Sequence, residues 1–130
     1  LVDDDAASWA GPLDSLLKRN EQTKHAELEI AESGNKALEM IKKGSFDLVL
    51  MDGNLMREYG HQVVRKIRAA GYAMPICMFS SDEVQATLGK EAGAEFSVNK
   101  KQLFDRSAPD LAFEQENVLA TIIILCTIRG

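Results

Sequence analysis

Cysteine and long apolar runs are both scarce in this chain of 130 residues, and each scarcity excludes a class of protein. Cys77 and Cys126 are isolated, with no CxxC pair and no His/Cys cluster at metal-ligand spacing. We interpret both as buried, reduced thiols of a cytoplasmic protein. The longest apolar stretch, residues 120–128, is interrupted by threonines and is far shorter than the ~20 residues that cross a bilayer. We therefore expect no membrane segment, and no secretory signal opens the chain.

Basic residues are also fewer than acidic ones. Fifteen Lys and Arg residues stand against twenty Asp and Glu residues, which gives a formal net charge of -5. That sign is wrong for a protein that binds nucleic acid phosphates, so we expect no direct nucleic acid partner. The length and a hydrophobic content of 45% fit one compact domain over residues 1–130, with an apolar core of its own.

Segments typical of strands alternate with segments of helical spacing along the whole chain. Most strand candidates are short apolar runs, whereas residues 26–31 alternate apolar and acidic side chains, as in a strand near a sheet edge. This alternation, with short connections, predicts an α/β fold with a parallel sheet and right-handed crossovers. The strand candidates are residues 1–2, 26–31, 48–51, 75–79 and 96–98, and the helix candidates are residues 8–20, 37–44, 63–70, 84–92 and 110–128.

The secondary structure of three of these segments is less regular or is not determined by the pattern alone. The first strand has only two residues where about five or six are usual, so we expect either upstream sequence or another segment to complete its pairing. Gly11 and Pro12 predict an irregular start for the first helix. Residues 110–128 predict a last helix, but the β-branched block 121–125 keeps a strand as an alternative. Such a strand would pair beside the first strand or across a dimer.

Reactive side chains follow four of the predicted strands. Because the carboxyl ends of parallel strands form the ligand-binding edge of an open sheet, we expect them to converge there. Carboxylates gathered so closely repel one another, and Mg²⁺ is a cation that suits them. A carboxylate beside Mg²⁺ can attack a phosphoryl donor if neighbouring groups neutralise the developing charge. The residues are Asp3 and Asp4, Asp52, Ser80 and Lys100.

Four motifs resemble, in order and spacing, the response-regulator receiver domains of two-component signalling, and the single-domain chemotaxis receiver is similar. The motifs are VDDD at 2–5, LVLMDGNLMREYG at 48–60, MFSS at 78–81 and AGAEFSVNK at 92–100. The resemblance covers residues 1–120. It implies a doubly wound, five-stranded parallel sheet in the flavodoxin-like order 2-1-3-4-5, with helices on both faces.

The resemblance also implies a role for each residue at the strand ends. Asp52 would accept a phosphoryl group from a histidine kinase or histidine phosphotransfer protein, hydrolyse it slowly, and signal to a downstream protein. It would do so without being a classical enzyme. The implied catalytic residues are Asp52, Ser80 and Lys100, and the implied Mg²⁺ ligands are Asp3, Asp4, Asp52 and the backbone carbonyl of Asn54.

Two other functions are alternatives to a phosphoacceptor receiver, and the first is suggested by departures from the family pattern. The family usually has proline where Met56 and Lys101 stand and an aromatic ring where Ser97 stands, and the segment 80–100 is short enough to predict an abbreviated fourth helix. These changes motivate the alternative of a pseudo-receiver that binds a partner without phosphorylation, although the intact acidic set argues against it. A phosphohydrolase of the haloacid-dehalogenase type would need a second carboxylate where Asn54 stands, so its general acid/base is missing.

Overall fold

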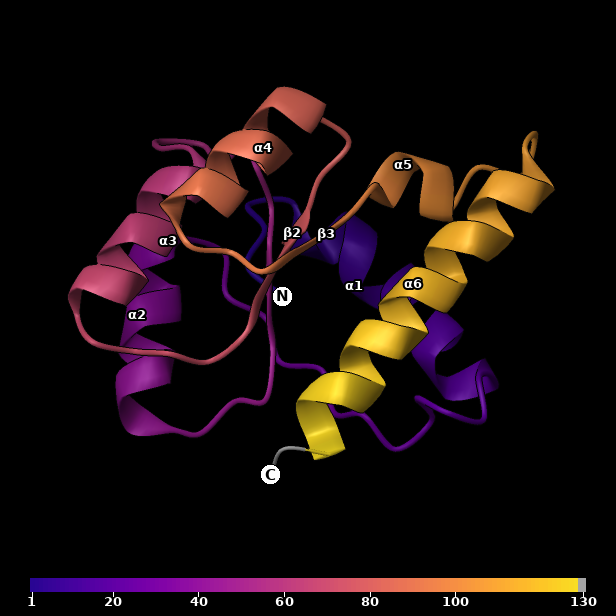
Figure 1. Ribbon diagram of the computed structural model, residues 1–130, viewed down its shortest axis with the longest axis horizontal. Coiled ribbons are helices and arrows are strands. Elements are labelled where there is room, and N and C mark those ends of the chain that lie inside the picture. The colour runs from indigo at the N-terminus through magenta and orange to yellow at the C-terminus, as the bar shows by residue number, and fades with distance from the viewer. Residues whose placement is uncertain (129–130) are drawn as a thin grey trace.

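The computed structural model describes residues 1–128 as six helices and three strands connected by short loops. Figure 1 shows the strands at the centre, with α2, α3 and α4 on one side and α1 and α6 on the other. Among the described residues, no helix is both long and apolar enough to cross a bilayer. The elements are α1 Ala6–Arg19, α2 Gly34–Lys43, β1 Val49–Met51, α3 Gly60–Ala69, β2 Ile76–Phe79, α4 Glu83–Ala92, β3 Phe96–Val98, α5 Lys100–Leu103 and α6 Pro109–Ile128.

The sheet is parallel, in the order β1-β2-β3. The register is defined at Cys77 of β2, which pairs with Leu50 of β1 on one side and with Phe96 of β3 on the other. Val2 lies on the far side of β1 and forms isolated parallel bridges to Met51 and to Ala31. A parallel sheet with helices on both faces confirms the predicted α/β class.

The core consists of two apolar layers, one on each face of the sheet. Every residue of β1 and β2 is buried, as expected for parallel strands covered on both sides. Successive side chains alternate between the two layers. The layer toward α2 and α3 contains Ala37, Ile41, Val49, Met51, Val63, Ile67, Ile76 and Met78. The layer toward α1 and α6 contains Leu13, Leu16, Leu50, Cys77, Phe79, Leu119, Ile122 and Cys126, so both cysteines are buried as predicted.

The edge strand predicted over residues 26–31 is wrong except at its last residue. Within the described chain, the one bridge that this segment forms joins Ala31 to Val2. A cavity of about 590 Å³ lies between residues 26–29 and residues 48–50, lined by apolar side chains such as Leu28 and Ile123. The short first segment reaches only the end of this stretch, where the Leu1 amino group donates to the Glu29 carbonyl at 2.8 Å and the Ala31 N–H donates to the Leu1 carbonyl at 2.8 Å, so residues 26–28 have no neighbouring strand in the described chain.

The irregular start predicted for the first helix is also wrong. Helix α1 begins at Ala6 and continues through Pro12. Proline in the second turn removes only the hydrogen bond that would reach the Ser8 carbonyl. The buried side chains of Leu13 and Leu16 hold the rest of the helix against the sheet, and this packing outweighs the lost bond.

Two further expectations about helices are settled by packing and capping. Helix α4 has ten residues and is regular rather than abbreviated, with the Asp82 carboxylate accepting hydrogen bonds from the backbone N–H groups of Val84 and Gln85. Residues 121–125 lie inside helix α6, so the strand alternative is wrong. Ile122 and Ile123 are buried in the layer shared with α1.

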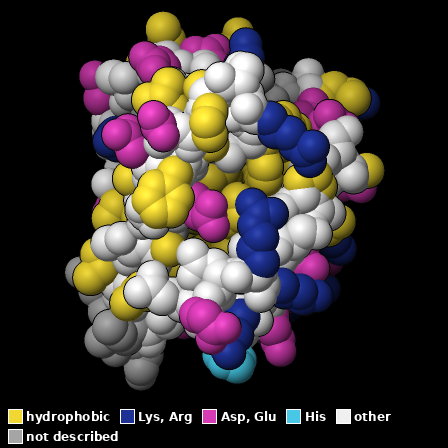
Figure 2. Space-filling view, turned by 90° about the vertical axis from the view of Figure 1, so that its right-hand side faces the viewer, with side chains coloured by type: hydrophobic (Ala, Val, Ile, Leu, Met, Phe, Trp, Pro, Cys, Tyr) yellow, Lys and Arg dark blue, Asp and Glu magenta, His cyan; other side chains and the backbone are white. Residues whose placement is uncertain are grey.

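Helix α6 also exposes part of its apolar surface. Leu111, Val118 and Leu125, spaced seven residues apart, are each between 42% and 50% exposed. Figure 2, which faces the right-hand side of Figure 1, shows hydrophobic side chains interspersed with charged ones. The dimer left open by the sequence stays a prediction.

Gly60 permits a close backbone approach between α3 and the end of β1. Its N–H donates to the Gly53 carbonyl at 2.9 Å. A Cβ atom at this position would collide with the carbonyl oxygen of Asp52. Only glycine therefore lets α3 begin directly behind the loop that follows Asp52.

We expect Gly60→Ala to lower the free energy of unfolding by roughly 2 kcal/mol or more, because backbone must move to admit the new methyl group. Gly11→Ala is the matched control: Gly11 lies inside α1 with open space around it. That change should alter stability by less than about 1 kcal/mol, because the usual gain from alanine in a helix interior is offset by crowding of its methyl group against the Pro12 ring. Urea denaturation followed by circular dichroism measures both. Equal stability of the two variants would contradict the close approach.

Candidate functional site

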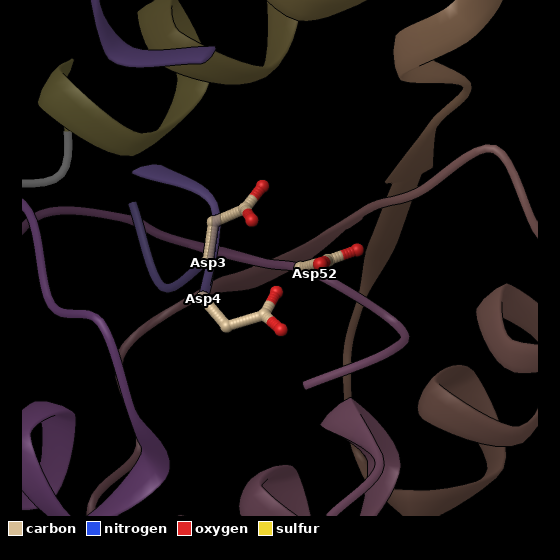
Figure 3. A group of neighbouring side chains, drawn as sticks. All are labelled: Asp3, Asp4 and Asp52. Carbon is tan, nitrogen blue, oxygen red and sulfur yellow. The ribbon is translucent and has the colours of Figure 1, made fainter. Parts of the chain in front are cut away.

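Three carboxylates meet at the carboxyl end of the sheet, from two segments far apart in sequence. Each of Asp3, Asp4 and Asp52 offers one oxygen atom that lies within 4.8 Å of the others. Figure 3 shows their side chains pointing in the same general direction. The register explains this, since the Asp52 N–H donates to the Val2 carbonyl at 2.9 Å and so aligns the two segments. Asp3 and Asp52 are buried, whereas Asp4 is exposed to solvent.

Lys100 supplies the one ammonium group that contacts this cluster among the described side chains. It follows β3 at the first position of α5. Its Nζ donates to Asp3 Oδ2 at 3.1 Å and to Asp52 Oδ1 at 3.2 Å. The lysine side chain is only 9% exposed, so water screens these pairs little. Three carboxylates against one ammonium leave an excess of negative charge.

The acidity of Asp52 reflects both its burial and that excess. The pKa of Asp52 is raised to about 6, first by burial and then by the charge of Asp3, while Lys100 and the Asn54 backbone N–H act in the opposite direction. Desolvation and a neighbouring like charge both disfavour the ionised form of a carboxyl. The ionised form of Asp52 is therefore disfavoured, and an additional cation would stabilise it.

The donor set fits a hard divalent cation. It contains only oxygen atoms, and exposed Asp4 leaves one side open to water, which suits an ion that keeps several water ligands. Asn54 lies on the exposed loop that follows Asp52, where its side-chain amide donates to Asp82 Oδ2 at 3.3 Å. The residues that would hold Mg²⁺ are thus at one edge of the sheet.

Ser80 directly follows β2 and lies beside Gly53, the residue that follows Asp52. Its side chain is buried, and its Oγ accepts a hydrogen bond from the Asp82 N–H at 3.1 Å. A Cβ atom on Gly53 would lie only 2.7 Å from Ser80 Oγ, so glycine leaves room for the hydroxyl there. All the residues that the sequence predicted for the site therefore lie at the same end of the sheet.

Ser97 leaves space where the family usually carries a ring. It is half-buried on β3, and it lines a cavity of about 280 Å³ together with Ser80, Thr87 and Lys90. A serine side chain is too small to fill such a cavity. The hydroxyl at Ser80 therefore has an open volume behind it instead of an aromatic neighbour.

Sequence reasoning did not identify two other groups near the site. The Trp9 ring centroid lies 4.6 Å from Lys100 Nζ. His61 Nδ1 lies 2.9 Å from Gln85 Oε1, which joins the start of α3 to α4. Trp9 had a signal in the sequence, since it is the one tryptophan and comes one helical turn after the acidic residues. The partner of His61 lies 24 residues away, and no local pattern indicates it.

The raised pKa of Asp52 predicts a pH-dependent stability in metal-free protein. The contribution of a carboxyl whose pKa is raised on folding is complete below about pH 4 and is lost as pH rises through about 6. We expect Asp52→Asn to be more stable than wild type at pH 7.5 by roughly 1–2 kcal/mol, after allowance for screening.

Urea denaturation in EDTA between pH 4 and pH 8 measures this difference, which should shrink toward pH 4. Asp47→Asn is the matched control, because Asp47 is exposed at the other end of β1. An Asp52→Asn variant that is less stable than wild type at pH 7.5 would contradict the electrostatic account.

Known receiver structures resemble this chain over most of its length. A response regulator from Chloroflexus aurantiacus shares 28% identity over 92% of this chain and 93% of its own, with a TM-score of 0.67. The response regulator TrrA from Thermotoga maritima, solved with Mg²⁺ and BeF, shares 26% identity over 86% and 93% of the two chains, with a TM-score of 0.60. A LuxR-family two-component response regulator from Aurantimonas shares 25% over 94% and 81%, with a TM-score of 0.71.

A family model gives the assignment directly. The response regulator receiver domain model matches residues 1–107. That range includes β1 to β3, the three clustered carboxylates, Ser80 and Lys100. By sequence, fold and placement of its charged residues, the chain belongs to the response regulator receiver domain family.

Proposed function

We propose that this receiver domain accepts a phosphoryl group on Asp52, in a Mg²⁺-dependent reaction, from a histidine kinase or histidine phosphotransfer protein. The observation that carries the proposal is the position of the Lys100 ammonium, which bonds to both buried carboxylates, Asp3 and Asp52. With Asp4 within reach, the cluster has acceptor, counter-charge and cation ligands in one place. We place this chemistry in the cytoplasm, in keeping with two buried cysteine thiols.

Each residue has a distinct part in the proposed transfer. Asp52 attacks the phosphorus atom; a bond from its carboxylate oxygen forms as the phosphorus–nitrogen bond of the donor histidine breaks, and the electron pair leaves with the imidazole. Lys100 and Ser80 stabilise the charge on the phosphoryl oxygens.

The metal ligands in this proposal are the three clustered carboxylates and the Asn54 backbone carbonyl. Mg²⁺, when bound, neutralises charge shared by the carboxylates and the phosphoryl oxygens. The high pKa of Asp52 supports this role, since the site has more negative charge than Lys100 compensates. Slow hydrolysis of the acyl phosphate would return the domain to its starting state.

We also infer that the sheet follows the order 2-1-3-4-5 in a partly paired form. Ala31, Val2, β1, β2 and β3 follow one another in that order. The first two positions contribute isolated bridges where longer strands would stand. The carboxyl edge, where the site lies, is the part that the bridges hold together.

One observation favours a second function, that of a partner-binding module whose output does not depend on phosphorylation. Ser97 lines an open cavity where the family usually has an aromatic ring. The ring that would respond to a change at Ser80 is therefore absent. Asn54 gives no support to a phosphohydrolase, because its amide bonds to Asp82 and cannot act as a general acid/base.

Intact-mass spectrometry with acetyl phosphate and Mg²⁺ tests the proposal. Wild type should gain one phosphoryl group, and the gain should disappear with EDTA or in Asp52→Asn. Lys100→Ala should lower the rate of gain by about a hundredfold or more, as for other groups that stabilise developing charge. Asp47→Asn should behave as wild type, because this exposed aspartate is remote from the cluster.

Two results would count against the acceptor role. If folded wild type gains no phosphoryl group at saturating donor and Mg²⁺, the partner-binding function takes its place. If Asp52→Asn gains the group as wild type does, another side chain is the acceptor.

A further inference from the structure

We propose that Trp9 is a positioning residue for this site: its ring holds the Lys100 ammonium when a divalent cation takes over the carboxylates. The inference rests on the proposed metal-dependent role of the cluster and adds a residue that the receiver motifs do not include. Trp9 touches Lys100 rather than the acceptor, so it would act through the lysine.

The ammonium of Lys100 lies between two kinds of partner. On one side are Asp3 Oδ2 and Asp52 Oδ1, at 3.1 and 3.2 Å. On the other is the Trp9 ring, with its centroid 4.6 Å from Nζ. A cation within about 6 Å of an indole face is attracted by the ring quadrupole, and tryptophan is the best of the aromatic residues at this. A small movement would therefore exchange one partner for the other.

The ring is held in place from both sides of the site. Trp9 belongs to α1, which begins directly after the acidic residues and is anchored in the core by Leu13 and Leu16. Phe104 follows α5, the helix that Lys100 begins, and its ring centroid lies 5.7 Å from that of Trp9 at an angle of 44°. Half-buried between these elements, Trp9 presents a fixed surface to the ammonium.

The need for such a surface follows from the charges. Lys100 and a bound divalent cation would compete for Asp3 and Asp52, because both require the same carboxylate oxygens. If the ammonium stayed between them, repulsion would weaken cation binding. If it moved out to water, it would be lost to the site. An indole ring attracts the ammonium but offers no oxygen ligand to Mg²⁺, so it separates the two cations without competing for either.

This arrangement predicts a coupling between Trp9 and Lys100 in Mg²⁺ binding. Without the ring, Lys100 remains between the carboxylates and opposes the metal. Without the lysine, there is no competing cation, and the ring has nothing to hold. The effect of changing Trp9 on Mg²⁺ affinity should therefore depend on the presence of Lys100.

A double-mutant cycle on the 130-residue chain measures that coupling. Mg²⁺ is titrated without phosphodonor into wild type, Trp9→Leu, Lys100→Met and the double variant, and the amide NMR signals of Gly53 and Asp52 are followed. Trp9→Leu should weaken Mg²⁺ binding about two- to fivefold, the range expected for a cation–π contact. Lys100→Met should tighten it, and Trp9→Leu should then have no effect. Trp9→Phe should lie between wild type and Trp9→Leu.

Tryptophan fluorescence gives a second, independent readout. Trp9 is the one tryptophan in the sequence, so all tryptophan emission comes from this position. Emission should change on Mg²⁺ addition in wild type and remain constant in Lys100→Met. Phe113→Leu, at an exposed aromatic on α6, is the matched control and should bind Mg²⁺ as wild type does.

Specific outcomes would overturn the inference. These are a Trp9→Leu variant with wild-type affinity, an equal loss of affinity with and without Lys100, or a wild type that binds no Mg²⁺. Trp9→Phe keeps the test open if the leucine variant fails to fold. Failure of the proposed function looks different: wild type would bind Mg²⁺ with the expected coupling and yet gain no phosphoryl group on Asp52.

Discussion

The Lys100 ammonium bonds to two buried carboxylates at once, Asp3 and Asp52, and the character of the whole site depends on this shared contact. One positive charge cannot compensate three clustered negative charges, and burial together with the charge of Asp3 raises the pKa of Asp52 to about 6. Such a site is unfavourable in isolation, because buried charge without full compensation is costly. The proposed divalent cation and phosphoryl group would supply the missing compensation, which is the property that a switch requires.

The register of the sheet brings the two carboxylates that contact Lys100 together. Val2 bridges Met51, so the acidic residues that follow Val2 lie beside the one that follows Met51. Gly60 and Gly53 allow α3 and the Ser80 side chain to approach the backbone around Asp52 closely. Helices on both faces exclude water from the strands, and the carboxyl edge of the sheet is where buried Asp3, Asp52 and Lys100 meet. Stability in the two core layers thus supports an edge that is itself electrostatically strained.

Short-range patterns in the sequence were sufficient for the central part of this description. Apolar runs predicted β1, β2 and β3, and the polar residue after each run predicted the site, because parallel strands end at one edge. Sequence patterns gave no correct prediction where contacts with residues distant in the sequence determine the structure. Residues 26–31 alternate like a strand, but only Glu29 and Ala31 bond to the short first segment. Arg68 is a basic residue of α3 that no local pattern marks as structural, yet it donates to the backbone carbonyls of Tyr72, Met74 and Gly93. The Trp9 contact with Lys100 also joins residues 91 positions apart.

A crystal structure of the protein with Mg²⁺ and beryllofluoride tests the central claim most directly, because it shows the acceptor and its partners together. The account predicts beryllofluoride bonded to a carboxylate oxygen of Asp52, Mg²⁺ held by Asp3, Asp4 and Asp52, and the Lys100 ammonium on a fluorine atom. Beryllofluoride on a different carboxylate, or Lys100 still bonded only to Asp3 and Asp52 with the analogue in place, would contradict it.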